Sequence, residues 1–293
     1  MRRRDFISGC GAAGFGLAAR AQMPPPKKAK IRSSVMLPRL PGTLEQKLEI
    51  AARAGLQSVE LSGEYTTWSE AERRGFLRLT RSFGLGVDAV NAMPRWRDMP
   101  VSMVDAADRD NLLAEVGKNI ALARRIEAPM LTLMSGPALP GVPRERQFGN
   151  LVESAKGCVA LAEKAGVTLL VEPRNDQAET PGFYLATVAE ALELIDRVAS
   201  PRLRLLFDVY HERMQTGGVT GAIEKAARYT RIYHVAGAPG RREPGTGEID
   251  YAAVYKAIAK TGFNGYIAME YDPSGDPVAS LIRSVDAMRA ALA

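Results

Sequence analysis

The sequence contains little cysteine and little histidine, and this limits the chemistry that the chain can perform. Two cysteines and two histidines occur among its 293 residues. Two histidines are too few for a histidine-rich trinuclear zinc site of the kind that cuts nucleic acid at abasic positions. Cys158 lies on an apolar helical face with Leu151, Ala155 and Ala162, so we expect it in the core. We therefore expect no thiolate at a metal or catalytic site.

The first 21 residues have the features of an export signal. The arginines at positions 2–4 precede a weakly apolar stretch rich in glycine and alanine, and Ala19 to Ala21 form an A-x-A cleavage site. These features predict a twin-arginine signal peptide over residues 1–21. A lipoprotein box ending at Cys10 is the second interpretation, although it leaves almost no apolar region ahead of the cysteine. We therefore expect a periplasmic or secreted protein.

Cleavage after Ala21 changes the composition of the mature protein. It removes Cys10, four arginines and one aspartate, so the formal net charge falls from +6 to +3 and no internal disulfide remains possible. This modest charge does not indicate a nucleic-acid-binding face. No later apolar run approaches the length that crosses a bilayer, so we expect no stable membrane insertion after signal removal. Residues 22–30, with three prolines and three lysines, are predicted to be a linker.

From residue 31 onward, short apolar runs alternate with segments of helical spacing. Several helical segments begin with capping boxes, such as Thr43 with Gln46 and Thr187 with Glu190. The predicted strands are 31–36, 58–61, 86–91, 130–134, 167–172, 203–208, 232–236 and 266–270. Eight such units predict a single (β/α)8 TIM barrel over residues 31–293, in the α/β class. An open doubly wound sheet is less favoured because no glycine-rich dinucleotide fingerprint follows the first strand.

The last four predicted strands end on, or close to, side chains that bind metals or transfer protons. These residues are Glu172, Asp208, His234 and Glu270. The carboxyl ends of barrel strands line the active-site face, so we expect the four side chains to be neighbours at the mouth. Three carboxylates and one imidazole suit one divalent ion, with Mg²⁺ or Mn²⁺ favoured and Zn²⁺ or Co²⁺ as alternatives. A single carboxylate in such a place is as often an ion-pair partner or a helix cap, but four on consecutive strands favour a site.

Four pieces of the sequence, LLVEPRN, LLFDVYH, APGRREPGTGEIDY and GYIAMEY, resemble the hydroxypyruvate isomerase family, within the xylose-isomerase-like sugar isomerases and epimerases. The resemblance covers the chain from about Ile31 to its end, and the PGRREPGTGE loop is its most specific part. It implies one divalent metal held by Glu172, Asp208, His234 and Glu270. Two positions depart from the family pattern. His234 stands where hydroxypyruvate isomerases usually have glutamine, as in the ketose 3-epimerases, and Arg213 stands where glutamine is expected.

The resemblance also implies chemistry through an enediolate. Moving a carbonyl along a carbon chain requires removal of a proton beside it, and a metal bound to the carbonyl and hydroxyl oxygens stabilises the resulting charge. Glu172 and Glu270 would be the catalytic residues, each with one oxygen on the metal and the other free to transfer a proton. His211 and Arg241 would hold substrate oxygens, and Arg241 could form a bidentate pair with a carboxylate. Stiffening of its loop is the alternative role for Arg241.

Glu60, Asn91 and Trp96 are expected to line the substrate pocket, with packing or loop structure as the alternative for each. The resulting hypothesis is a metal-dependent aldose-ketose isomerase of the hydroxypyruvate isomerase type, acting on a small hydroxy-keto acid or sugar. The first alternative is an exported epimerase or isomerase of a free sugar or keto-sugar. A metal-dependent nuclease would need more histidines and a strongly basic face. A non-catalytic sugar-binding module would not need both glutamates.

The export signal can be tested directly. Changing Arg3 and Arg4 together to lysine keeps the charge and removes the arginine pair, so we expect the precursor to remain in the cytoplasm. Cell fractionation followed by immunoblotting measures the distribution. Unimpaired export of this variant would show that the segment is not a twin-arginine signal.

Overall fold

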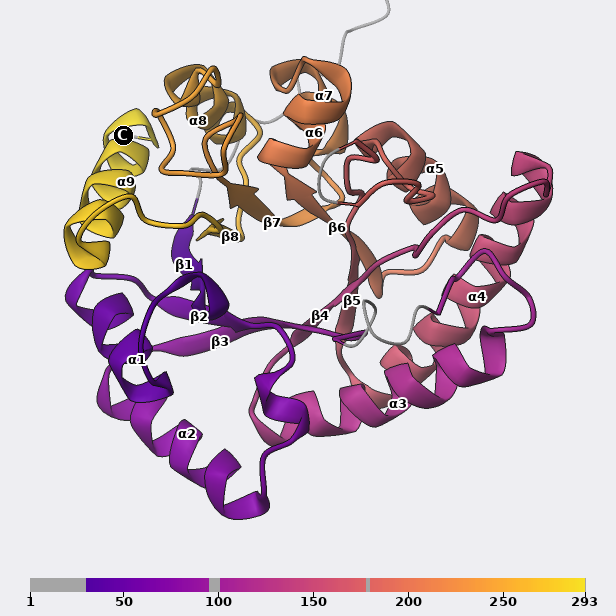
Figure 1. Cartoon of the computed structure of the whole chain (residues 1–293), viewed down its shortest axis with the longest axis horizontal. Helices are drawn as coiled ribbons and strands as arrows, with labels where there is room; N and C mark the ends of the chain where they lie inside the picture. Colours follow the sequence, from indigo (N-terminus) through magenta and orange to yellow (C-terminus); the bar gives the residue numbers. More distant parts are fainter. Residues whose placement is uncertain (1–29, 95–100, 178–179, 293) are drawn as a thin grey trace, which may run out of the picture.

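A computed structural model describes residues 30–94, 101–177 and 180–292, and within them eight parallel strands close into one barrel. The strands are β1 (Arg32–Met36), β2 (Ser58–Leu61), β3 (Gly86–Asn91), β4 (Met130–Leu133), β5 (Thr168–Val171), β6 (Leu203–Asp208), β7 (Thr230–Val235) and β8 (Tyr266–Met269). Neighbouring strands follow chain order, and β8 pairs with β1 to complete the ring (Figure 1). The predicted single TIM barrel is confirmed. The predicted signal peptide and all but the last residue of the predicted linker lie outside the described residues.

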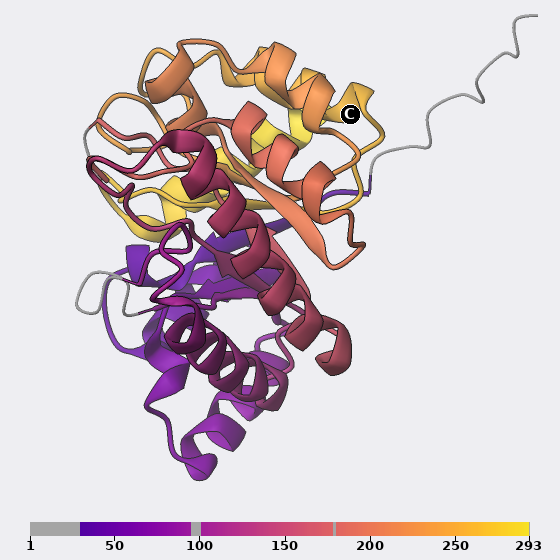
Figure 2. The ribbon, with the colours of Figure 1, turned by 90° about the vertical axis from the view of Figure 1, so that its right-hand side faces the viewer.

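Helices alternate with the strands and surround the barrel (Figure 1). They are α1 (Leu44–Arg53), α2 (Glu70–Ser82), α3 (Arg109–Arg125), α4 (Arg144–Ala165), α5 (Val188–Val198), α6 (Val209–Thr216), α7 (Thr220–Ala226), α8 (Tyr251–Lys260) and α9 (Pro277–Leu292), with short 3-10 helices η1 (Leu37–Arg39) and η2 (Glu64–Thr66). Figure 2 shows α3 and α4 packed against each other on the outside. Capping boxes form at Thr43 and Thr187, as predicted. No helix in the described ranges is long and apolar enough to cross a membrane.

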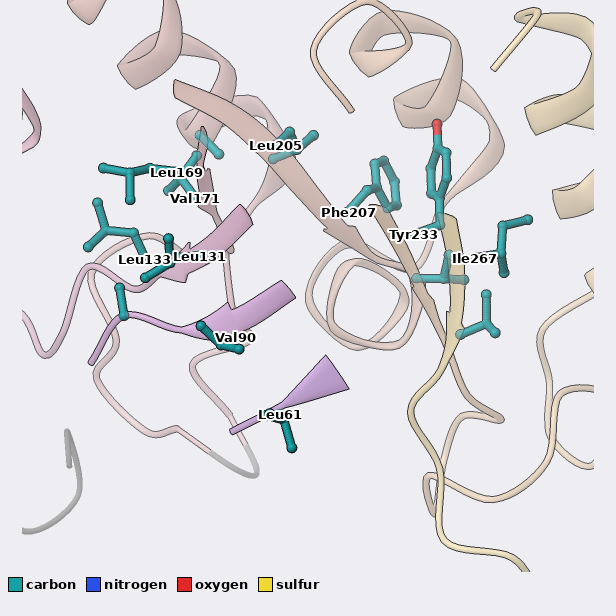
Figure 3. Packing of buried hydrophobic residues seen from close by; sticks show 14 of the residues in the cluster. Leu61, Val90, Leu131, Leu133, Leu169, Val171, Leu205, Phe207, Tyr233 and Ile267 are labelled. Carbon is teal, nitrogen blue, oxygen red and sulfur yellow. The ribbon is translucent and has the colours of Figure 1, made fainter. Parts of the chain in front are cut away.

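Apolar side chains fill both faces of the barrel wall. Residues such as Val90, Leu131, Phe207 and Tyr233 lie on the outer face, in the core shared with the helices (Figure 3). Cys158, on α4, is fully buried in this outer core, as expected. A separate inner layer comprises Ala89, Met130, Leu170, Leu206, Ile232 and Ala268.

The inner layer forms the floor beneath the four predicted ligands. Side chains alternate along a strand, so a residue two positions beyond an inward-facing one also faces inward. Leu170, Leu206, Ile232 and Ala268 each precede a predicted metal ligand by two positions in the sequence. The apolar floor and the polar mouth are thus consecutive layers of the same strands.

A bulge in β7 sets the register of the ligand on that strand. Leu205 pairs with Thr230 but Leu206 pairs with Ile232, so one extra residue lies in β7. The shift places His234 opposite Asp208. Without it, the residue before His234 would pair with Asp208, and the imidazole would face the helices instead of the barrel interior.

The loop after β7 folds tightly back on itself. The Gly237 amide donates to the Arg242 carbonyl at 2.7 Å, and the Glu248 amide donates to the Ala238 carbonyl at the same distance. A Cβ atom on Gly247 would lie 2.3 Å from the Ala238 carbonyl oxygen. Only glycine therefore allows the two sides of this loop to approach so closely.

This close approach predicts the effect of Gly247→Ala. Overpacking of this kind typically costs about 1–3 kcal/mol, so we expect the free energy of unfolding to fall by that amount. Gly221→Ala is the matched control, because no atom lies within 4 Å of a Cβ built at that helical position. Urea denaturation measures both variants. Equal stability of the two would contradict this account of the loop.

Candidate metal and active site

Glu172, Asp208, His234 and Glu270 meet at the carboxyl ends of β5 to β8. One ligand atom from each residue lies within 4.8 Å of those of the other three. Each of these residues is 6% exposed or less. Asp208 is the last residue of β6, and Glu172 and Glu270 directly follow β5 and β8. The structure therefore brings the four candidate ligands into one buried cluster.

Two buried arginines balance the negative charge of the carboxylates. The Arg241 Nη2 atom lies 3.0 Å from Asp208 Oδ2 and 2.8 Å from Glu270 Oε2. The Arg174 Nη1 atom lies 3.0 Å from Glu172 Oε1. Arg241 has a backbone φ of 50°, in the left-handed region that non-glycine residues seldom adopt. The surrounding contacts must hold this conformation, which directs its guanidinium into the cluster.

Asp208 combines a structural role with its position in the cluster. Its Oδ1 atom accepts hydrogen bonds from the Tyr210 and His211 amides at 2.8 and 3.2 Å, and so caps α6. Its Oδ2 atom faces Arg241 and the other candidate ligands. A helix cap and a ligand, which were alternatives at the sequence level, are thus compatible in one side chain.

The two glutamates have pKa values shifted in opposite directions. Burial raises the pKa of Glu172 to about 7, with the Glu270 carboxylate adding to the effect and Arg174 opposing it. Burial also acts to raise the pKa of Glu270, but Arg241 and His234 outweigh it and hold that pKa well below the usual range. Two carboxyl groups separated in this way can take different roles in proton transfer.

His234 contacts a carboxylate through each ring nitrogen. Its Nε2 atom lies 2.9 Å from Glu60 Oε2, and its Nδ1 atom lies 2.6 Å from Glu270 Oε2. Burial acts to lower the pKa of His234, but Glu60 and Glu270 outweigh it and raise the pKa well above the usual range. Although Nδ1 and the Glu270 oxygen are close, their geometry is not that of a well-directed hydrogen bond, and the same oxygen pairs with Arg241.

The ligand set fits a divalent cation. Three carboxylates and one imidazole offer oxygen and nitrogen donors of the type that Mg²⁺, Mn²⁺ and Zn²⁺ accept. Buried polar atoms normally have a hydrogen-bond partner, and His234 Nδ1 has none with good geometry, which is compatible with a nitrogen that binds a cation in this cluster.

A cavity of about 260 Å³ opens beside the cluster. Its lining comprises Met36, Pro38, Arg39, Glu60, Leu61, Ser62, Asn91, Thr132, Glu172, Arg174, His234 and Glu270. Glu60 and Asn91, both expected in the pocket, are among them. Trp96, the third expected pocket residue, lies outside the described residues. A larger hollow of about 720 Å³ lies between α4 and α5, and its lining includes none of the candidate ligands.

His211 and Arg241 lie behind the ligands and are not part of the cavity lining. His211 Nδ1 lies 2.6 Å from Asn175 Nδ2, and His211 Nε2 lies 3.2 Å from Arg241 Nη1. Burial, reinforced by Arg174 and Arg241, lowers the pKa of His211 well below its usual value. A neutral His211 therefore supports the Arg241 guanidinium, which itself contacts two candidate ligands.

Sequence reasoning missed two arginines of the cavity. Arg174 belongs to the quoted LLVEPRN segment, two residues after Glu172, so its position was a usable signal. Arg39 lies in η1 after β1, and no carboxylate at the end of that strand marked the position as part of the site. The Arg39 Nη2 atom lies 3.5 Å from Glu270 Oε1. Arg213, the departure from the family pattern, pairs with Glu248 at 3.1 Å and so ties α6 to the loop after β7.

Comparison with known proteins identifies relatives of this chain. The sequence profile of the xylose isomerase-like TIM barrel family matches residues 48–291. A Mus musculus protein named "Putative hydroxypyruvate isomerase" is 28% identical over 268 residues, covering 87% of this chain and 93% of that protein. Hydroxypyruvate isomerase of Escherichia coli (strain K12) is 32% identical over 166 residues, covering 57% of this chain and 64% of that protein. The solved structure of an L-ribulose 3-epimerase superposes with a TM-score of 0.74 at 21% identity, covering 89% of this chain and 94% of that chain, which shows a shared fold.

Substitution of Asp208 tests the cluster as a metal site. Asp208→Ala removes a ligand and the α6 cap, and cap loss costs about 1 kcal/mol, so we also use Asp208→Asn, which keeps a capping oxygen. Both variants should fold. Asp208→Ala, which removes a candidate ligand, should lose the bound metal and activity, whereas Asp208→Asn keeps an amide oxygen and should bind the metal more weakly than wild type. Elemental analysis after dialysis measures metal content, and circular dichroism checks folding. A stoichiometric metal ion in folded Asp208→Ala would place the site elsewhere.

Proposed function

The chain belongs to the xylose isomerase-like TIM barrel family, and from this premise we propose that it is a metal-dependent aldose-ketose isomerase acting on a small hydroxy-keto acid. Its relatives are named isomerases and epimerases, so it is an enzyme of one of these two kinds. One observation carries the finer proposal. Glu172 and Glu270 belong to the same ligand cluster and also line the same cavity. This position suits residues that act on a substrate and hold a cation at once.

Proton transfer is assigned to these two glutamates. A bound divalent ion would supply Lewis-acid stabilisation of the negative charge that develops when a proton beside the carbonyl is removed. Glu172 is the better match for the base, because burial raises the pKa of this group in the metal-free protein and so strengthens its basicity relative to Glu270. Glu270, held ionised by Arg241 and His234, would accept the proton of the substrate hydroxyl and deliver it to the neighbouring carbon, while the proton taken up by Glu172 passes to the former carbonyl oxygen.

Two arginines among the cavity-lining residues offer binding groups for an acidic substrate, although three glutamates line the same cavity. The Arg174 guanidinium lines the cavity beside Glu172, and Arg39 lines it beside Glu270. Guanidinium groups bind carboxylates in a planar, bidentate geometry. A cavity of about 260 Å³ suits a molecule of a few carbons. A three-carbon acid such as hydroxypyruvate fits a cavity of this size, and its carboxylate is assigned to Arg39 and Arg174.

Epimerisation of a keto-sugar is the second candidate function. His234 favours it, because the ketose 3-epimerases resemble this chain in having histidine at the third ligand position. In that reaction the proton returns to the same carbon from the opposite face, which the two glutamates could also perform. A neutral sugar would leave the charges of Arg39 and Arg174 without a substrate partner, so this candidate ranks second.

We also propose that the enzyme works outside the cytoplasm. The arginine pair and A-x-A site in the first 21 residues support export by the twin-arginine route. This route carries folded proteins, so the metal could be acquired before export.

A proton-exchange screen in D₂O with added Mn²⁺ tests the function. The substrates are hydroxypyruvate, ketoses and keto-sugars, and NMR follows both deuterium uptake and products. We expect deuterium at the hydroxymethyl carbon of hydroxypyruvate and formation of 2-hydroxy-3-oxopropanoate. Exchange restricted to a ketose carbon, with formation of its epimer, would instead identify the second candidate. No exchange with any of these substrates would reject both.

Glutamine substitutions separate proton transfer from metal binding. Glu172→Gln and Glu270→Gln each keep a ligating oxygen and the side-chain volume but remove the base. We expect a modest loss of metal affinity and a fall in turnover of about 100- to 10,000-fold or more. Glu172→Gln should abolish solvent deuterium exchange, whereas Glu270→Gln should retain exchange without net isomerisation. Near-normal turnover in both variants would mean that these residues only hold the metal.

A further inference from the structure

Glu60 makes a long-range contact that a role in substrate binding does not explain. It lies on β2 and His234 lies on β7, with β1 and β8 between them in the ring. The Glu60 Oε2 atom is nevertheless 2.9 Å from His234 Nε2. Glu60 is 1% exposed and His234 is 2% exposed, so water does not compete for this contact. Barrel closure thus brings together two side chains separated by 174 residues.

The contact has a specific consequence for the imidazole. A neutral histidine carries a proton on one ring nitrogen and a lone pair on the other, and a metal binds the lone pair. Each nitrogen of His234 faces a carboxylate, but Glu270 is itself a candidate ligand, so a cation bound beside it would replace the proton on Nδ1, whereas the Glu60 carboxylate keeps the proton on Nε2. The Nδ1 atom faces the cluster, 2.6 Å from Glu270 Oε2. The ring is therefore oriented with its second nitrogen toward the other candidate ligands.

We propose that Glu60 is a positioning residue: it accepts the Nε2 proton of His234 and so fixes the ring orientation and tautomer in which Nδ1 binds the metal. This inference rests on the metal site of the proposed function and assigns Glu60 to the ligand, not to the substrate. Carboxylate partners of this kind raise the basicity of a histidine ligand, and their loss typically lowers metal affinity by about 10- to 100-fold.

Asp88 offers a matched control in the same buried region. It is the extra residue of a bulge in β3, since Val59 pairs with Val87 and Glu60 pairs with Ala89. Its Oδ1 atom accepts hydrogen bonds from the hydroxyls of Ser34 and Ser58, each at 2.9 Å. Asp88 is fully buried, and none of its hydrogen bonds involves His234 or another candidate ligand. Burial and the nearby charge of Glu60 raise the pKa of Asp88 well above its usual value. Asp88→Asn therefore disturbs the polar interior of the barrel but keeps the Glu60 carboxylate as the partner of His234.

The first measurement locates the proton on His234 in the metal-loaded protein. Protein labelled with ¹⁵N-histidine and loaded with diamagnetic Zn²⁺ gives signals from two imidazoles only, because the chain has two histidines. Long-range ¹H–¹⁵N couplings distinguish Nε2, which couples to both ring carbon-bound protons, from Nδ1. We expect the His234 proton on Nε2. A proton on Nδ1 would overturn the proposal.

The second measurement compares metal affinity among variants by isothermal titration with Mn²⁺. Glu60→Leu removes the acceptor and should weaken binding about 10- to 100-fold. Glu60→Gln keeps an acceptor oxygen and should recover part of the affinity, and Asp88→Asn should stay within about threefold of wild type. Circular dichroism confirms folding. If Glu60→Leu fails to fold, Glu60→Gln still tests the proposal, which requires the Mn²⁺ affinity of Glu60→Gln to lie below that of wild type.

The outcomes separate this proposal from the proposed function. Wild-type protein that binds no Mn²⁺ would overturn both. If wild-type protein binds Mn²⁺ and both Glu60 variants bind it with the same affinity, only the positioning role is overturned. If the Glu60 variants have a raised KM for substrate but unchanged metal affinity, Glu60 binds substrate and the positioning role is overturned. An equal loss of metal affinity in Asp88→Asn would overturn it too, because it would show a general effect of the buried polar groups.

Discussion

Four carboxylates are buried at one end of the barrel, and their neutralisation is the constraint on which the surrounding structure depends. Glu60, Glu172, Asp208 and Glu270 are each 6% exposed or less. A buried carboxylate without a partner is strongly unfavourable, so each must be paired, bind a cation or take up a proton. Arginines, a histidine and, in the proposed function, a divalent metal meet this requirement. The cations that stabilise the mouth of the barrel are therefore the same groups that tune its chemistry.

The loop after β7 contributes a buried arginine to this charge balance. It carries Arg241, whose backbone lies in the left-handed region and whose guanidinium contacts Asp208 and Glu270. Close backbone contacts around Gly247 and the pairing of Glu248 with Arg213 hold the loop in place. The glycines and charged residues of this segment thus help to place the buried Arg241 guanidinium beside the candidate ligands.

Much of the barrel could be predicted from the sequence because local patterns specify it. Buried parallel strands are apolar runs, and the observed strand ends lie within two residues of the predicted ones. The side-chain alternation of such strands is also local, so the inward-facing residue near each strand end could be named. Capping boxes mark helix starts through contacts only three residues apart.

The contacts among the site residues could not be predicted, because they depend on closure of the ring. The pairing of Glu60 with His234 crosses two intervening strands, and the register of His234 depends on a one-residue bulge in β7. Arg39 reaches Glu270 only because β1 and β8 are neighbours in the closed sheet. Sequence patterns therefore indicated which residues face the mouth, whereas the three-dimensional structure shows which of them act on one another.

The most direct measurement is the position of a bound metal. A crystal grown with Mn²⁺ and measured on both sides of the manganese absorption edge gives an anomalous difference map specific for that ion. The account predicts one peak, about 2.0–2.6 Å from oxygens of Glu172, Asp208 and Glu270 and from Nδ1 of His234. A manganese peak away from these residues, or none in crystals that diffract well at millimolar Mn²⁺, would contradict it.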